Sequence, residues 1–80
     1  MITVKLYGMM REDSGISRLE VQAGTVREAC AQIVETGVDG KRLRSCVMFV
    51  NGRPLQGANR LSTRMRDGDE LAILSPVGGG

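Results

Sequence analysis

The sequence contains no histidine and no tryptophan, and its only aromatic side chains are those of Tyr7 and Phe49. Histidine is the side chain that most often acts as a general base near neutral pH, so its absence excludes the commonest form of acid–base catalysis. A platform of stacked rings for single-stranded nucleic acid is excluded as well, because it needs several aromatic residues. No serine or cysteine has a basic partner at a recognisable spacing. We therefore expect no active site formed by this chain alone.

Cysteine is also scarce, and the two thiols, Cys30 and Cys46, do not form a Cys-x-x-Cys pair. Without histidine, they are too few for a structural zinc site or an iron–sulfur cluster within one chain, so we expect this chain to bind no metal or other cofactor. Both thiols are predicted to be reduced. Cys30 falls on the apolar side of a predicted helix, which favours a small core residue over a reactive thiol.

Long hydrophobic runs are missing too. No stretch approaches the roughly 20 apolar residues of a membrane-spanning helix, and the sequence shows no signal-peptide pattern and no Asn-x-Ser/Thr glycosylation site. We therefore expect a cytoplasmic protein without a membrane partner.

Neither sign of charge dominates the chain. Eleven basic residues are set against nine acidic ones, for a net charge of +2 at pH 7. The only basic clusters lie at residues 41–44 and 60–66, whereas binding to a phosphate backbone usually needs a continuous basic stripe. The pattern favours a solvated face or an acidic protein partner over nucleic acid.

The chain does have the composition of a small globular domain. Its 80 residues are 41% hydrophobic and 25% charged, which argues against disorder. A chain of this length has room for one hydrophobic core. We expect a single domain over residues 1–75 and a flexible tail over residues 76–80.

Two segments near the N-terminus alternate between apolar and polar residues. Apolar side chains occupy every second position of residues 2–6 and again of residues 19–23. A period of two is typical of half-buried strands, and the two segments predict an antiparallel hairpin.

Further strands are predicted in the second half of the chain. Residues 46–50 are apolar throughout and are followed by Asn51-Gly52, a strong tight-turn signal. A short return strand at residues 53–55 contains a proline, which marks a sheet edge. The turn at residues 67–70 then leads into an apolar strand at residues 71–74.

One helix is predicted between these groups of strands. Thr25 and Glu28 have the spacing of a capping box, in which each side chain accepts a hydrogen bond from a free backbone N–H at the helix start. Gly37 supplies a left-handed stop. The apolar residues on one side of this helix are Val26, Ala29, Cys30, Ile33 and Val34.

A single helix covers only one face of a sheet. The strand at residues 46–50 is apolar on both faces, so its second face needs another cover. One interpretation is an ordinary core strand that the loop at residues 56–65 covers in part. The other is an exposed patch that binds a protein partner, formed by Tyr7, Met48, Phe49 and Leu74.

Residues 37–41 resemble a phosphate-binding loop at first sight. Too few residues separate the two glycines, however, and Arg42 stands where serine or threonine must hold magnesium. We therefore predict no nucleotide site in this chain.

The sequence ends in Ser75 and a short tail of Pro76, Val77, Gly78, Gly79 and Gly80. Glycine has no Cβ and adopts nearly any backbone torsion, so a terminal carboxylate flanked by glycines is unusually unhindered. We interpret Gly80 as the reactive position and residues 76–79 as a segment that inserts into a partner's site. A frayed end or a cloning remnant is the alternative.

The predicted order of strand, strand, helix, strand, short strand and strand, with a glycine pair at the end, resembles the ubiquitin-like sulfur carriers of the MoaD/ThiS family. The resemblance covers the whole chain. It is carried by Met10-Arg11-Glu12 and Gly15, Thr25-Val26, Val50-Asn51-Gly52, the turn at residues 67–70, and Pro76-Val77 before Gly79-Gly80. It implies an α+β fold, the β-grasp, in which a mixed sheet of about four to five strands packs on one helix.

The family resemblance also implies a mechanism. An ATP-dependent adenylyltransferase resembling ubiquitin-activating enzymes would adenylate the Gly80 carboxylate, and a sulfur donor protein would convert the acyl-adenylate into a thiocarboxylate. A sulfur-consuming large subunit or synthase would then take the sulfur. The resemblance thus implies a protein cosubstrate and not an enzyme, with ATP and metal held by the activating partner.

Two details bear on the pathway. The chain length and residues 7–15 are similar to MoaD, the small subunit of molybdopterin synthase, whereas the ending Val77 to Gly80 is more like ThiS of thiamine biosynthesis. Ser75 and Gly78 stand where MoaD chains carry a proline and a small non-glycine residue. We favour molybdopterin biosynthesis, with thiamine biosynthesis as the alternative. An alternative of another class is a ubiquitin-like modifier or docking module, which forms amide bonds through Gly80 or only docks through its sheet.

Overall fold

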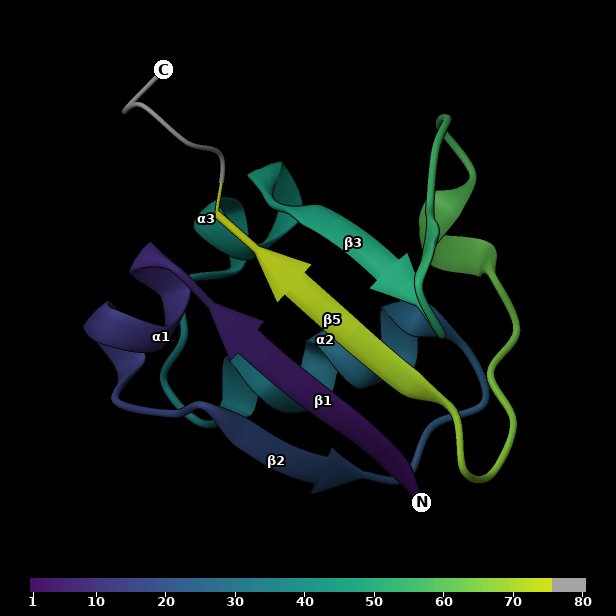
Figure 1. Ribbon diagram of the computed structural model, residues 1–80, viewed down its shortest axis with the longest axis horizontal. Coiled ribbons are helices and arrows are strands. Elements are labelled where there is room, and N and C mark those ends of the chain that lie inside the picture. Colours follow the sequence, from purple (N-terminus) through teal and green to yellow (C-terminus); the bar gives the residue numbers. More distant parts are fainter. Residues whose placement is uncertain (76–80) are drawn as a thin grey trace.

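The structure is a computed structural model that describes residues 1–75 of the chain. Its strands form one mixed sheet in the order β2-β1-β5-β3-β4, and the longest helix, α2, lies behind this sheet (Figure 1). The strands are β1 (Ile2–Tyr7), β2 (Arg18–Val21), β3 (Val47–Val50), β4 (Arg53–Pro54) and β5 (Glu70–Leu74). The helices are α1 (Met9–Ser14), α2 (Val26–Glu35) and α3 (Gly40–Ser45), with a 3-10 turn, η1, at Arg60–Ser62.

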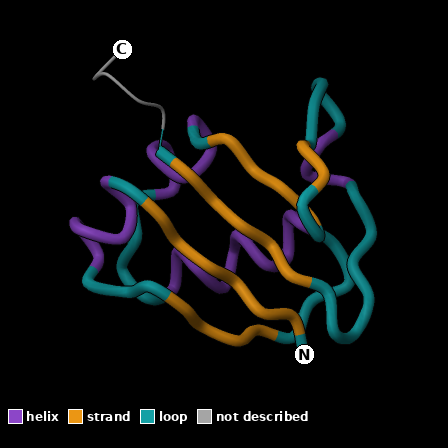
Figure 2. Tube along the Cα trace, in the orientation of Figure 1, coloured by secondary structure: helices purple, strands orange, loops and turns teal. Residues whose placement is uncertain are grey.

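The two central strands, β1 and β5, run parallel although they come from opposite ends of the described chain. Their register pairs Thr3 with Glu70 and Tyr7 with Leu74. β2 pairs antiparallel with β1 on one side, and β3 and β4 extend the sheet antiparallel on the other. Figure 2 shows the strands as one layer with α2 behind them. This is the β-grasp fold that the family resemblance implies.

The hydrophobic core lies between the sheet and α2. Alternate strand residues point toward the helix, and burying each large aliphatic side chain stabilises the fold by roughly 1.5–3 kcal/mol. The sheet contributes Ile2, Val4, Leu6, Val21, Met48, Leu71 and Ile73, and α2 contributes Val26, Ala29, Cys30 and Ile33.

Helix α2 begins where the sequence predicts. Thr25 Oγ1 accepts a hydrogen bond from the Glu28 amide at 3.2 Å, and the Glu28 carboxylate accepts one from the Gly24 amide at 2.8 Å. Beyond the helix end, Gly37 has a φ of 107°, as expected of a left-handed stop. The prediction that Val34 belongs to the buried stripe is wrong. Its side chain is 40% exposed, because it lies beside Gly40 at the start of α3 and not against the sheet.

The short helices α1 and α3 occupy segments where the sequence patterns predict no helix. α1 lies between Gly8 and Gly15, both at positive φ. Asp39 is the N-cap of α3, and its carboxylate accepts a hydrogen bond from a first-turn amide at 2.9 Å. Each helix spans six residues and buries a single side chain, Met10 or Leu43, so no periodic stripe marks it in the sequence. Among residues 1–75, every helix is too short or too polar to span a membrane.

Side-chain hydrogen bonds tie the turn before β5 to the hairpin between β3 and β4. The Asn51 side chain donates to the Asp69 carboxylate at 2.9 Å and accepts from the Glu70 amide at 2.9 Å. The Asp69 carboxylate also accepts from the Arg66 amide at 2.8 Å. Because these bonds favour the ionised form, they lower the pKa of Asp69, the Arg66 amide most strongly and the Asn51 side chain next.

Two neighbours in β3 allow a test of the two sheet faces, since Met48 is 0% exposed and Val47 is 44% exposed. We expect Met48→Ala to lower the free energy of unfolding by about 2–5 kcal/mol, because it leaves a cavity in the core. Val47→Ala, the matched control, should change it by about 0.5 kcal/mol or less. Urea unfolding measures both, and equal losses would contradict the assignment of the faces.

The lowered pKa of Asp69 predicts a pH dependence of stability. Since the folded-state value lies below the unfolded value of about 3.9, the stabilisation is present above that pH and is lost as pH falls through the folded-state pKa. In Asp69→Asn we expect the free energy of unfolding to fall less steeply below about pH 4. Denaturant unfolding at a series of acidic pH values checks this. An unchanged slope in Asp69→Asn would refute the prediction.

Candidate functional site

Within the described residues, no helix covers the sheet face opposite α2 (Figure 1). The strand register places two neighbouring rows of mainly apolar side chains on this face, close to the end of β5. We call these apolar residues the outer patch. The first row consists of Tyr7, Leu74 and Val47. The second row consists of Ala72, Phe49 and Pro54.

The outer patch is partly exposed and is confined to one end of the sheet. Tyr7 and Val47 are 39% and 44% exposed. Lys5, the partner of Ala72 across the strands, borders the second row and forms an ion pair with Glu70 at 3.1 Å. One step farther from the end of β5 the face is polar, where Thr3 is the partner of Glu70. The apolar part of the face therefore lies next to the point where β5 ends.

The structure brings together three of the four residues that the sequence predicts for a partner surface, namely Tyr7, Phe49 and Leu74. Met48 does not belong to this surface, because its side chain points into the core and is fully buried. Val47 takes its place, a residue that the sequence patterns do not single out. Strand alternation could have identified Val47, because an inward Met48 requires both of its neighbours to face outward.

The loop at residues 56–65 does not cover the outer patch, so that alternative is wrong. Arg64 forms a β-bridge with Thr25 at the start of α2, and the Val26 amide donates to the Thr63 carbonyl at 2.9 Å. Leu61, in η1, borders a hollow that α2 and α3 also line. The loop therefore packs on the helix side of the sheet.

The tail residues predicted to react with and enter a partner lie outside the described residues; they are Pro76, Val77, Gly78, Gly79 and Gly80. The described chain ends at Ser75, directly after β5. Ser75 thus follows the first row of the outer patch.

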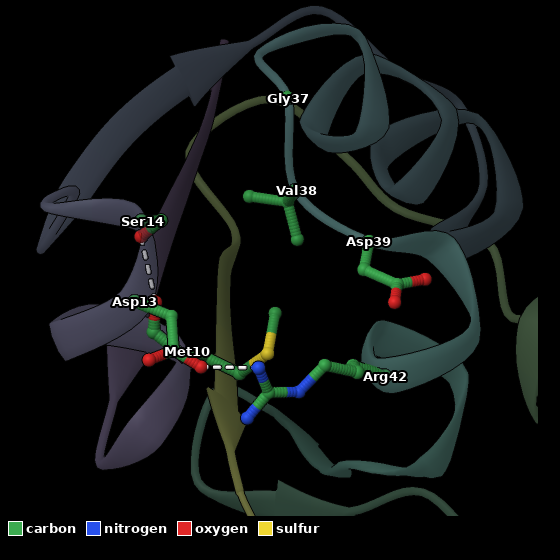
Figure 3. Close-up of a pocket in the computed structure, with 7 residues that line it drawn as sticks. All are labelled: Met10, Asp13, Ser14, Gly37, Val38, Asp39 and Arg42. Carbon is green, nitrogen blue, oxygen red and sulfur yellow. Dashed lines mark hydrogen bonds and ion pairs between the residues drawn. The ribbon is translucent and has the colours of Figure 1, made fainter.

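A small hollow lies between α1 and α3 (Figure 3). Its volume of about 200 Å³ is below the roughly 300–1,000 Å³ of most small-molecule sites. The polar side chains that line it already have partners, since Asp13 forms an ion pair with Arg42 and Asp39 caps α3. Ser14 donates a hydrogen bond to the Met10 carbonyl at 2.6 Å. We assign no ligand to this hollow.

The two cysteines are free and buried, in agreement with the sequence prediction. Burial raises the pKa of the Cys30 thiol and of the Cys46 thiol, although nearby arginines oppose the effect at both. A buried thiol with a raised pKa is a poor nucleophile near neutral pH. Among residues 1–75, no group of three or more acidic or cysteine side chains could hold a metal ion.

Comparison with known proteins identifies the family of this chain. The model of the ThiS family matches residues 4–80. No curated protein matches the chain. Among solved structures, the small archaeal modifier protein 1 from Methanosarcina acetivorans is 24% identical, with a TM-score of 0.80 over 99% of this chain and 95% of that one.

Two solved complexes contain similar chains. One is the complex of subunits 1 and 2 of the molybdopterin-converting factor from Helicobacter pylori 26695, with 25% identity, a TM-score of 0.71, and coverage of 99% of this chain and 97% of that chain. The other is the BexX/CysO complex from Amycolatopsis orientalis, with 27% identity, a TM-score of 0.75, and coverage of 100% of both chains. The family model spans nearly all of the β-grasp domain and the tail, and the chain therefore belongs to the ThiS family of ubiquitin-like sulfur carriers.

Proposed function

We propose that this protein carries sulfur as a thiocarboxylate on Gly80 and donates it in the biosynthesis of a cofactor. The observation that carries this proposal is the position of the outer patch in a member of the ThiS family. The row formed by Tyr7, Leu74 and Val47 lies directly before Ser75, from which the glycine-rich tail continues. A partner that binds the patch would receive the tail at a defined place, which favours reaction by proximity.

The activation step converts an unreactive carboxylate into a good acyl donor. A Gly80 carboxylate oxygen attacks the α-phosphorus of ATP, and pyrophosphate leaves. A sulfur donor protein then delivers a hydrosulfide equivalent to the carbonyl carbon, where a C–S bond forms as the C–O bond to AMP breaks. The glycines at positions 78–80 leave the carbonyl open to both reagents. ATP and its metal belong to the activating partner, an adenylyltransferase of the ubiquitin-activating type.

For the sulfur-consuming step, we propose a large subunit of the molybdopterin synthase type, with thiamine biosynthesis as the alternative pathway. The Helicobacter pylori complex joins a chain similar to this one with subunit 2 of the molybdopterin-converting factor, which supports a heteromer of this kind. The BexX/CysO complex contains a similar chain with a different partner. Chains of this fold therefore occur in complexes with different partners.

A second candidate function is a ubiquitin-like modifier. The likeness to small archaeal modifier proteins favours it, and it would use the same patch and the same activation of Gly80. The two functions differ in their product, which is a thiocarboxylate for the carrier and an amide bond to a lysine for the modifier.

Intact mass spectrometry tests the carrier function. After incubation with ATP, an adenylating partner and a sulfur donor, we expect a mass gain equal to the replacement of one oxygen by one sulfur at Gly80. Appending one residue after Gly80, or the substitution Gly79→Phe, should abolish the gain, because the extra bulk blocks approach to the carboxylate. Circular dichroism should show an unchanged fold. Normal thiocarboxylate formation by either variant, or linkage of the wild-type chain to lysines only, would overturn the proposal.

The outer patch is tested by Leu74→Asp. Placing a charge at a half-buried position of the patch should weaken binding to the activating partner about tenfold or more, because the carboxylate must lose its water on docking. Calorimetric titration measures the affinity. The control is Ala31→Asp, which adds the same charge at an exposed position of α2 on the other side of the sheet. Equal losses in both variants, or none in Leu74→Asp, would remove the patch from the interface.

A further inference from the structure

Ser75 lies where the sheet, α1 and the tail meet. Its hydroxyl oxygen accepts a hydrogen bond from the Met10 amide at 2.9 Å, across 65 positions of the sequence. That amide belongs to the first turn of α1, whose own N-cap residue, Gly8, provides no side-chain cap. Ser75 therefore satisfies a helix-start amide that a local side chain would ordinarily satisfy.

The same hydroxyl lies beside the side chain of Cys46, where it lowers the pKa of the thiol against the raising effect of burial. The Cys46 thiol in turn donates to the Arg42 carbonyl in α3 at 3.1 Å. Cys46 is 3% exposed, so this side of Ser75 is shielded from water.

The backbone of α1 also approaches Ser75 closely. A Cβ placed on Gly8 would lie 3.7 Å from the Ser75 Cβ, and Gly8 has a φ of 64°. The residue between the outer patch and the tail is therefore held by the start of α1 and lies beside Cys46.

We propose that Ser75 is a positioning residue, whose hydroxyl fixes the direction in which the C-terminal arm leaves the sheet. The inference rests on the proposed function, in which a partner grips the patch that ends at Leu74 and reacts with Gly80. Ser75 separates these two parts. When the Ser75 backbone is fixed before docking, fewer backbone torsions lose their freedom as the partner binds the tail, so binding costs less conformational entropy.

The test compares Ser75→Ala with Ser75→Thr in the full chain. Ser75→Ala loses the hydroxyl, and Ser75→Thr keeps it. In thiocarboxylate formation by the activating enzyme, we expect the KM for the Ser75→Ala carrier to rise about fivefold, the ratio that corresponds to the loss of a typical helix cap. Its kcat should stay unchanged, because the bound tail reaches the same geometry. Ser75→Thr should stay within about twofold of wild type.

A second readout does not depend on the reaction. In Ser75→Ala, hydrogen exchange of the Met10 amide should accelerate and the ¹⁵N relaxation of Val77 should indicate greater mobility, while Ser75→Thr should match wild type in both. If Ser75→Ala melts at a lower temperature but has wild-type KM and wild-type Val77 relaxation, the residue is only structural and the inference fails. It also fails if Ser75→Thr is as impaired as Ser75→Ala. If wild type forms no thiocarboxylate, the proposed function fails, and the exchange and relaxation data still decide the role of Ser75.

Discussion

Parallel pairing between β1 and β5 is the interaction on which the rest of the structure depends. It joins two segments from opposite ends of the described chain at the centre of the sheet, and its inward residues form the middle of the core. β1 and β5 end at the same edge of the sheet. α1 follows β1 and Ser75 follows β5, so the pairing of the two strands also brings α1 against Ser75. The core and the origin of the tail are therefore set by one register.

The second constraint is that the described chain has one long helix for a sheet with two faces. α2 covers the inner face, and the loop at residues 56–65 packs beside the helix, so the outer face stays partly open. Its apolar side chains gather at the end where β5 leads to the tail, and its polar ones at the other end. An uneven distribution of this kind suits a protein that docks on an enzyme and presents its own terminus as the substrate. In the proposed function, the partner supplies the chemistry and this chain supplies the reacting carboxylate.

Sequence reasoning succeeds wherever a periodic pattern or a local cap is long enough to be recognised. The positions of the strands along the chain follow from alternation and from apolar runs. The start of α2 follows from the pair Thr25 and Glu28. It fails at α1 and α3, which are too short to show a period and whose termini depend on single residues such as Asp39. It also fails at Met48, because an entirely apolar strand gives no indication of which residues face the core.

The sequence by itself determined where the strands and the long helix lie along the chain and that the tail is rich in glycine, since these follow from local periodicity and from the chemistry of individual residues. The fold class followed from the family resemblance. Only the tertiary structure decided which side of β3 stays exposed, because the pairing register with β5 determines which side chains of β3 point away from the core. It alone placed Ser75 against Met10 and Cys46, since no local pattern links residues so distant in sequence. Contacts within one element are encoded locally, whereas contacts between elements depend on how the whole chain packs.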